Sequence, residues 1–203
     1  MAQIDSYNVC FLGVTGFGKS SLINACAGTK LLTDTMAPCT KELYSIIRHE
    51  GGDRYVAFFD TPGICEFLDN KEYFRFYEHA VSVADCIVLV QTLARAYTSP
   101  AQKLLKSLIP YLSTEKKQRF VIAINHIDGT GQRPTEENLI CNYKPWNEET
   151  NTPTDECLKL VEAKIVDVKA NFGKEVFTIE PRIVPTCAFR NYGIKELKSV
   201  IFD

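Results

Sequence analysis

The sequence predicts a doubly wound α/β fold, in which helices cover both faces of a mostly parallel sheet. Short apolar runs rich in strand-forming residues alternate along the 203 residues with longer amphipathic stretches. Two of these runs, residues 85–91 and 120–125, are nearly continuous in Val, Ile, Leu and Cys, as in strands buried on both faces. A glycine-rich turn follows the first apolar run of the chain, residues 7–12. Ligands of such sheets bind where the strands end.

Composition is consistent with one domain over residues 1–203, because 45% hydrophobic residues in a chain of this length build one sizeable core. The formal net charge of −2 supplies no basic excess for nucleic acid or anionic lipid. The chain starts without a secretory pattern, and its longest apolar stretch is shorter than the roughly 20 residues that cross a bilayer. A cytoplasmic protein is therefore expected. The eight cysteines are scattered singly, which argues against zinc or disulfide scaffolds.

The first half of the chain is expected to begin with a strand, a turn and a helix. The strand covers residues 7–12, and the helix runs from Ser20 to Gly28, a typical helix stop. Two strands are then predicted over residues 42–48 and 54–59. The Gly-Gly pair between them suits a tight hairpin turn, so these strands are predicted to be the one antiparallel pair.

In the second half, a helix is predicted between the two buried strands, over residues 100–112. The leucines that form its apolar stripe are Leu104, Leu105, Leu108 and Leu112. A longer helix is predicted over residues 155–172. The apolar residues that share one of its faces are Leu158, Val161, Ile165 and Val168. A last helix begins at residue 193 and stops abruptly at Asp203, which suggests that the native chain continues.

Residues 129–154 are the one clear shift in composition. This stretch is polar, contains three prolines and Trp146, and shows no core periodicity. We expect a long surface insertion, and loops of that length in a compact domain are usually functional or mobile. Use by a partner or a regulator is favoured over an inert insertion.

The turn after the first strand reads GVTGFGKS over residues 13–20. This matches the phosphate-binding P-loop pattern GxxxxGK(S/T), in the strand–turn–helix setting that the motif requires. The glycines let the backbone wrap phosphate oxygens, and the start of the helix presents N–H groups and a positive dipole end. Lys19 is expected to reach the β- and γ-phosphates, and Ser20 to place its hydroxyl on Mg²⁺.

The sequence DTPG at residues 60–63 ends the third strand and fits a DxxG switch motif. Asp60 is expected to meet the magnesium ion, and Gly63 to bring its backbone N–H close to the γ-phosphate. Thr40, which lies immediately before the second strand, can offer its hydroxyl to Mg²⁺ and its N–H to the same phosphate. Thr33 and Thr35 compete with it for that role.

The sequence NHID at residues 125–128 follows the last buried strand and is close to the NKxD motif of guanine readers. A carboxylate at Asp128 accepts two hydrogen bonds from the guanine N1–H and amino groups. Adenine offers neither in that arrangement, so it would leave the acid unpaired. Guanine rather than adenine nucleotides are therefore predicted. The alternative is that Asn125 and Asp128 merely cap the loop.

Together these motifs resemble the G domains of translation-factor-class GTPases, over essentially the whole chain. GKSSLINA at residues 18–25, the DTPG and YGIKEL at 192–197 look like the Era and MnmE-related branch, and the insertion after NHID is similar to the bacterial YfjP-type subgroup. The resemblance implies a three-layer Ras-like P-loop NTPase fold with a six-stranded, mostly parallel sheet and one antiparallel edge pair. In that register Cys187 and Ala188 occupy the fifth motif, and the Ala188 N–H would bind the guanine carbonyl oxygen.

Three residues depart from the family pattern. His126 replaces the motif lysine, which gives the base a ring to stack on but a titratable charge. Ile64 follows the DTPG, where Ras-like enzymes have a glutamine that orients the attacking water, so intrinsic hydrolysis is expected to be slow. Gly16 stands where potassium-activated relatives have an asparagine.

The predicted function is therefore a molecular switch that binds GTP and hydrolyses it to GDP and phosphate with Mg²⁺. The expected nucleotide-binding residues are Gly13, Thr15, Gly16, Phe17, Gly18, Lys19, Ser20, Ser21, Asp60, Gly63, Asn125, His126, Asp128, Cys187 and Ala188. The expected catalytic residues are Lys19, Thr40 and Gly63, and the expected metal ligands are Ser20, Thr40 and Asp60.

The alternative is an interaction module with negligible turnover, similar to septins or AIG1-like proteins, that is gated by nucleotide. Ile64 and His126 favour it, and it implies a homodimer through the nucleotide face. If the chain does turn GTP over, Ile64 implies that an external activator or self-association supplies the missing help. The aromatic-rich segment after DTPG, residues 67–77, is a candidate face for such a partner.

Overall fold

The computed structural model describes residues 5–30, 43–51, 54–64, 73–93, 98–112, 119–129, 144–172 and 181–203. Six strands form one sheet in the order β2-β3-β1-β4-β5-β8, and only the β2–β3 pair is antiparallel. The strands are β1 (Asp5–Gly13), β2 (Tyr44–Gly51), β3 (Arg54–Asp60), β4 (Cys86–Thr92), β5 (Arg119–Asn125) and β8 (Arg182–Pro185). The predicted sheet, with its antiparallel edge pair, is confirmed.

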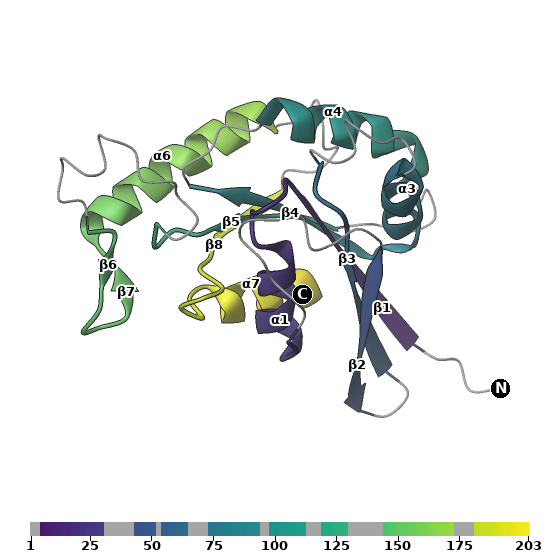
Figure 1. The fold of residues 1–203 in the computed structure, drawn as a ribbon, viewed down its shortest axis with the longest axis horizontal. Coiled ribbons are helices and arrows are strands. Elements are labelled where there is room, and N and C mark those ends of the chain that lie inside the picture. Colours follow the sequence, from purple (N-terminus) through teal and green to yellow (C-terminus); the bar gives the residue numbers. More distant parts are fainter. Residues whose placement is uncertain are drawn as a thin grey trace.

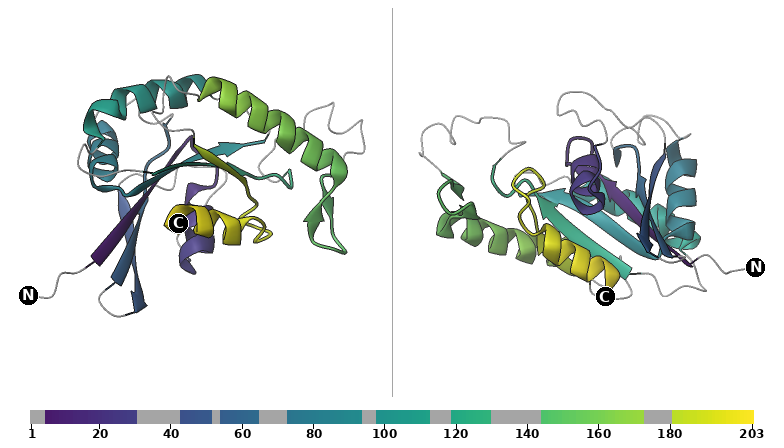
Figure 2. Two further views of the ribbon diagram at one scale, coloured as in Figure 1. Left: turned by 180° about the vertical axis from the view of Figure 1, so that it is seen from behind. Right: turned by 90° about the horizontal axis from the view of Figure 1, so that it is seen from below.

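Helices cover both faces of this sheet and make the predicted three layers (Figures 1 and 2). One face carries α1 (Lys19–Ala27) and α7 (Ile194–Phe202). The other carries α3 (Phe74–Val83), α4 (Thr98–Leu108), which continues as the 3₁₀ turn η2 (Ile109–Tyr111), and α6 (Asp155–Asn171). Within the described ranges, no helix is both long and apolar enough to cross a membrane.

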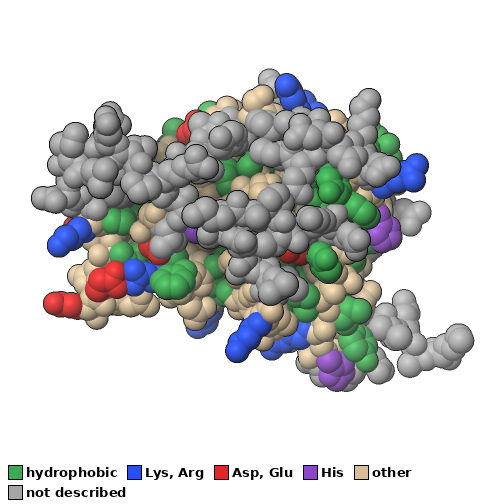
Figure 3. Space-filling view, in the orientation of Figure 1, with side chains coloured by type: hydrophobic (Ala, Val, Ile, Leu, Met, Phe, Trp, Pro, Cys, Tyr) green, Lys and Arg blue, Asp and Glu red, His purple; other side chains and the backbone are tan. Residues whose placement is uncertain are grey.

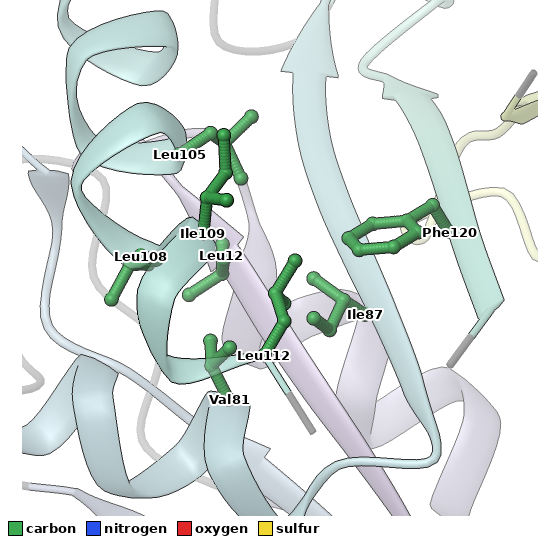
Figure 4. A pocket seen from close by; sticks show the side chains of 8 residues that line it. All are labelled: Leu12, Val81, Ile87, Leu105, Leu108, Ile109, Leu112 and Phe120. Carbon is green, nitrogen blue, oxygen red and sulfur yellow. The ribbon is translucent and has the colours of Figure 1, made fainter. Parts of the chain in front are cut away.

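The core lies on both sides of β4, all seven residues of which are buried. Between the sheet and the helices α3 and α4 is a small cavity of about 10 Å³, lined by apolar side chains (Figure 4). That volume is at the limit for a single water molecule and the lining offers it no hydrogen-bond partner. The cavity is therefore a packing gap in the core and not a ligand site.

Helix α6 corrects one prediction from the sequence. Val161 and Val168 are buried as expected, but Leu158 is 39% exposed. The buried stripe instead includes Cys157 and Lys164. The Cys157 thiol donates a hydrogen bond to the Ile127 carbonyl at 3.0 Å, so a contact with the neighbouring loop sets which face of the helix turns inward.

The structure describes both ends of the predicted surface insertion, residues 129–154. Residues 130–143 lie outside the described residues, whereas the end of the segment forms a two-stranded hairpin, β6 (Trp146–Asn147) and β7 (Thr152–Pro153). Trp146 is 6% exposed and belongs to a small second core with Ile124, Ile127, Cys157, Val161 and Cys187. This part of the insertion is thus packed against the domain.

Part of the aromatic segment after DTPG, the candidate partner face, packs against the rest of the domain. Tyr77 on α3 is fully buried, and its hydroxyl donates a hydrogen bond to the Pro62 carbonyl at 2.8 Å. Phe74 is partly buried and meets Tyr111 edge-on, with ring centroids 5.6 Å apart. Phe67 lies outside the described residues. The described aromatics of this segment therefore serve largely in packing.

Candidate functional site

The predicted site residues gather at one edge of the sheet. The parallel strands β1, β3 and β5 end at Gly13, Asp60 and Asn125, and all three residues occupy the carboxyl ends of their strands. Asp60 is paired with Phe11 of β1, and Asn125 with Thr92 of β4. Loops that leave the sheet at this edge therefore converge, which is where open α/β sheets bind ligands.

The P-loop wraps over the start of α1. Lys19 is the first residue of the helix, is 6% exposed, and donates from Nζ to the Gly13 carbonyl at 3.1 Å. The Phe17 N–H donates to the Val14 carbonyl at 3.2 Å, and the Phe17 ring is buried in the core. The ammonium group thus lies across a loop that opens onto a helix N-terminus, an arrangement that favours an anion.

Ser20 and Asp60 meet beside this loop. The Ser20 Oγ donates to Asp60 Oδ2 at 2.5 Å, and Asp60 is only 2% exposed. The next residue, Thr61, is also buried, and its hydroxyl donates to the Phe11 carbonyl at 2.7 Å. A hydroxyl and a carboxylate are hard oxygen donors of the kind that Mg²⁺ takes from proteins. The pair therefore fits the expected metal site.

The DTPG turn is pressed against the P-loop. A Cβ at Gly63 would overlap both Oγ1 and Cβ of Thr15, so only glycine allows this approach. The following Ile64 is 0% exposed and belongs to the main core. Its side chain is therefore enclosed by the core, and Ile64 offers no polar group that could orient a water.

Two further predicted residues of this half are Gly16, a loop residue with φ of 79°, and Ser21, which is half-buried in the first turn of α1. Thr40 and its competitors Thr33 and Thr35 lie outside the described residues. The predicted third metal ligand thus remains a prediction.

The base-side motif contacts the P-loop directly. Asn125 is fully buried, donates from Nδ2 to the Phe17 carbonyl at 3.1 Å, and accepts at Oδ1 from the Ala188 N–H at 3.2 Å. A Cβ at Gly18, whose φ is 84°, would overlap Asn125 Nδ2 and crowd His126 Nε2. Asn125 therefore joins the phosphate loop, the base motif and the fifth motif into one unit.

His126 and Cys187 are both perturbed by their burial beside Asp128. Burial lowers the pKa of His126 from its ordinary 6.5, and the nearby Asp128 charge opposes that shift. Burial raises the pKa of Cys187 to about 12, and a hydrogen bond to Asp128 contributes in the same direction. Position 126 thus holds a neutral imidazole and position 187 a neutral thiol near neutral pH.

Asp128 has a partner that the sequence analysis missed. Its side chain is 0% exposed, and Oδ2 lies 3.5 Å from Arg190 Nε. Arg190 in turn binds Glu148 of the hairpin through both terminal nitrogens, at 2.5 and 2.6 Å. The position of Arg190 two residues after the fifth motif was a clue to its location, but nothing in the sequence pattern linked it to Glu148.

Comparisons with known proteins agree with this geometry. A family model described as a 50S ribosome-binding GTPase matches residues 8–126. GTP-binding protein ERG of Arabidopsis thaliana is 26% identical over 204 residues, 79% of this chain and 46% of that protein. GTPase Era of Thermosipho melanesiensis is 26% identical over 199 residues, 96% of this chain and 54% of that protein. The chain thus spans about half the length of these curated relatives.

Among solved structures, a complex of Era with MgGDPNP and nucleotides 1506–1542 of 16S ribosomal RNA has a TM-score of 0.65 to this chain at 18% identity. The likeness covers 98% of this chain and 57% of that one, and at such identity it supports the fold. The family model identifies the family, since its match extends from the first strand through the P-loop and DTPG to His126. The chain belongs to the 50S ribosome-binding GTPase family, as a P-loop GTPase of the Era type.

Proposed function

We propose that this chain binds guanine nucleotide and hydrolyses GTP to GDP and phosphate, with Mg²⁺ at Ser20 and Asp60. The observation that carries the proposal is the 2.5 Å contact of Ser20 Oγ with Asp60 Oδ2, which brings the P-loop and DTPG motifs to one point beside Lys19. The family membership and the fold support it, since both are those of GTPases.

Lys19 supplies the fixed positive charge of the phosphate half. Its ammonium rests on the Gly13 carbonyl within the loop that would surround the β-phosphate, which supports a role in binding β- and γ-oxygens. The loop amides add donors at the positive end of α1. Bound Mg²⁺ would neutralise charge on the same phosphates. Together these groups stabilise the charge that develops as water attacks the γ-phosphate.

Asp128 supplies the choice of base. Its two carboxylate oxygens accept the N1–H and the amino group of guanine, and the Ala188 N–H can turn from Asn125 Oδ1 to the guanine carbonyl. Adenine would place an acceptor against the buried carboxylate, which costs more than the loss of a hydrogen bond. GTP is therefore the proposed substrate rather than ATP.

Loss of the γ-phosphate is the proposed switching event. Gly63 is packed on Thr15 of the P-loop, and this close approach supports a contact between the Gly63 N–H and a γ-phosphate bound in the loop. Thr40 is the proposed second contact. When phosphate leaves, both contacts are lost and the segments that carry them can relax, as in other switch proteins.

A second candidate is an interaction module that holds nucleotide with negligible turnover. The observation that favours it is the burial of Ile64, because a side chain in the core cannot orient a catalytic water. Such a module pairs through the nucleotide face, as septin-like and AIG1-like relatives do. If the chain does hydrolyse GTP, self-association or an external activator supplies the group that orients the attacking water.

The charge of this chain does not support an RNA partner. Ribosomal RNA is part of the Era complex described above, and this chain spans only 57% of that protein. The residues of this chain carry a formal net charge of −2, which gives no electrostatic reason to transfer that partner.

The test is a single-turnover GTP hydrolysis assay with Mg²⁺, run across protein concentration and repeated with Lys19→Ala. We expect slow phosphate release that Lys19→Ala reduces by about 100-fold or more, since a phosphate clamp is lost. Lys195→Ala, at an exposed position on α7, is the matched control and should leave the rate unchanged. Release that rises with concentration indicates self-association, whereas tight GTP binding without release supports the interaction module.

A further inference from the structure

Arg190 links the base motif to the hairpin of the insertion. Its Nε lies 3.5 Å from Asp128 Oδ2, and its two terminal nitrogens bind the two oxygens of Glu148 at 2.5 and 2.6 Å. One guanidinium group thus joins residues from three loops that are far apart in sequence. Figure 3 shows acidic and basic side chains side by side over the β6–β7 hairpin.

Arg190 packs against residues that are themselves held by contacts within the hairpin and with Tyr192. Trp146 lies under the guanidinium, 5.4 Å from its carbon to the ring centroid, and packs edge-on against Tyr192. The indole N–H donates to Asn151 Oδ1 at 3.1 Å, which ties the two arms of the hairpin together. The end of the hairpin is fixed by Thr154, which caps α6 through the Cys157 N–H. Arg190 is therefore held in one position by a packed element.

We propose that Arg190 is a positioning residue for guanine recognition, with Glu148 as its anchor. Arg190 binds one oxygen of Asp128 and so fixes the rotation of the carboxylate that reads the base. This inference rests on the proposed function, because it needs a guanine at Asp128. It assigns the β6–β7 hairpin of the insertion to the base site rather than to the surface alone.

Carboxylate chemistry makes the arrangement compatible with a bound base. A carboxylate has about four acceptor positions on two oxygens, and Arg190 uses one of them. The contact with Arg190 by itself therefore does not prevent the carboxylate from accepting the guanine N1–H and amino groups. A positive charge also offsets the cost of burying a side chain that is 0% exposed. Because the guanidinium fork is planar and rigid, binding Glu148 sets where Nε points.

A comparison of guanine and hypoxanthine nucleotides can show whether Arg190 orients the Asp128 carboxylate or only stabilises the fold. Guanine needs both oxygens of Asp128 at once, whereas hypoxanthine, which lacks the amino group, needs only one. A carboxylate that is free to rotate therefore loses affinity for GDP more than for IDP. A variant that only loosens the fold would weaken both nucleotides equally.

The experiment measures the Kd of GDP and IDP with Mg²⁺ for the wild-type chain and for Arg190→Gln. We expect GDP affinity to fall about tenfold and IDP affinity by less than about threefold, as expected for loss of one charged hydrogen bond. Glu148→Gln, which leaves Arg190 in place, should shift the ratio in the same direction by a smaller factor. The matched control is Arg182→Gln, because Arg182 is a 65% exposed arginine paired with Asp203 away from this site.

The outcomes separate the inference from the proposed function. Absence of GDP binding in the wild-type chain would overturn the proposed function. Normal wild-type binding with an unchanged ratio of GDP to IDP affinity in Arg190→Gln would overturn the inference alone. An equal loss for both nucleotides would also overturn it, since that is the result of a structural role. Glu148→Gln repeats the same ratio test if Arg190→Gln does not fold.

Discussion

The two halves of the site are built in different ways. On the phosphate side, the contacts come from two short motifs, and many of them involve backbone, as in the bond from Lys19 to the Gly13 carbonyl. On the base side, they are mainly side-chain contacts between distant segments, such as the bonds of Arg190 to Asp128 and Glu148. A backbone site can be recognised from local spacing, whereas a side-chain site depends on how the whole chain packs.

The departures from the family pattern follow the same division. The phosphate side keeps its motifs and differs at Ile64, which has become a core residue. The base side has a neutral His126 in place of lysine and a buried Cys187 in the fifth motif, and Arg190 links it to the hairpin. Two of these three departures, His126 and Cys187, therefore lie on the base side.

Asp128→Asn tests the base side with the largest expected effect. The amide would turn a donor toward the guanine amino group but would complement the carbonyl that xanthine has there, so GDP affinity should fall on the order of 100-fold while affinity for xanthosine diphosphate rises. Titration of both nucleotides measures the change. Asp155→Asn, at an exposed aspartate of α6, should change neither affinity. An unchanged preference for GDP would show that Asp128 does not read the base.

Ile64→Gln tests the phosphate side. Because Ile64 is 0% exposed in the core, the new amide should be buried without partners and cost about 2 kcal/mol of unfolding free energy. It should not speed GTP hydrolysis, since the side chain is enclosed by the core. Denaturant unfolding and single-turnover assays measure the two effects, and Ile47→Gln, at a residue that is 68% exposed, is the control. Faster hydrolysis would contradict this placement.

Substitution of His126 is expected to have the smallest effect, on the pH dependence of the unfolding free energy. Burial lowers its pKa, so the folded chain binds a proton at His126 less readily than the unfolded chain does, whose imidazole titrates at about 6.5. The unfolding free energy should therefore fall as the pH drops below about 6.5 and be unaffected by this group well above it. His126→Asn should flatten this part of the pH profile of stability relative to wild type. A slope as steep in His126→Asn as in wild type would refute the assignment.

Local patterns predicted most of the fold. The motif GVTGFGKS placed the P-loop and the start of α1, and the apolar runs placed β1, β4 and β5. The last strand, Arg182–Pro185, has only four residues and was not located, although six strands were expected. Such a short run carries little periodicity, and its pairing with β5 decides its structure.

The errors have a common cause in tertiary contacts. Helical spacing placed Leu158 on the buried face of α6, but Cys157 is held inward by its bond to the Ile127 carbonyl. Lack of periodicity placed Trp146 in a surface loop, but a single large aromatic can fill a small core without any repeat. Arg190 and Glu148 are separated by 42 positions, so no sequence window contains both.

Trp146 has one more consequence, because it is the only tryptophan in the chain. Its ring lies against Arg190, which in turn holds Asp128, so its excited state experiences the electric field of the base motif. The chain therefore contains an intrinsic optical reporter. Emission excited selectively at tryptophan will follow events at the base site in real time, without a dye attached to any of the eight cysteines.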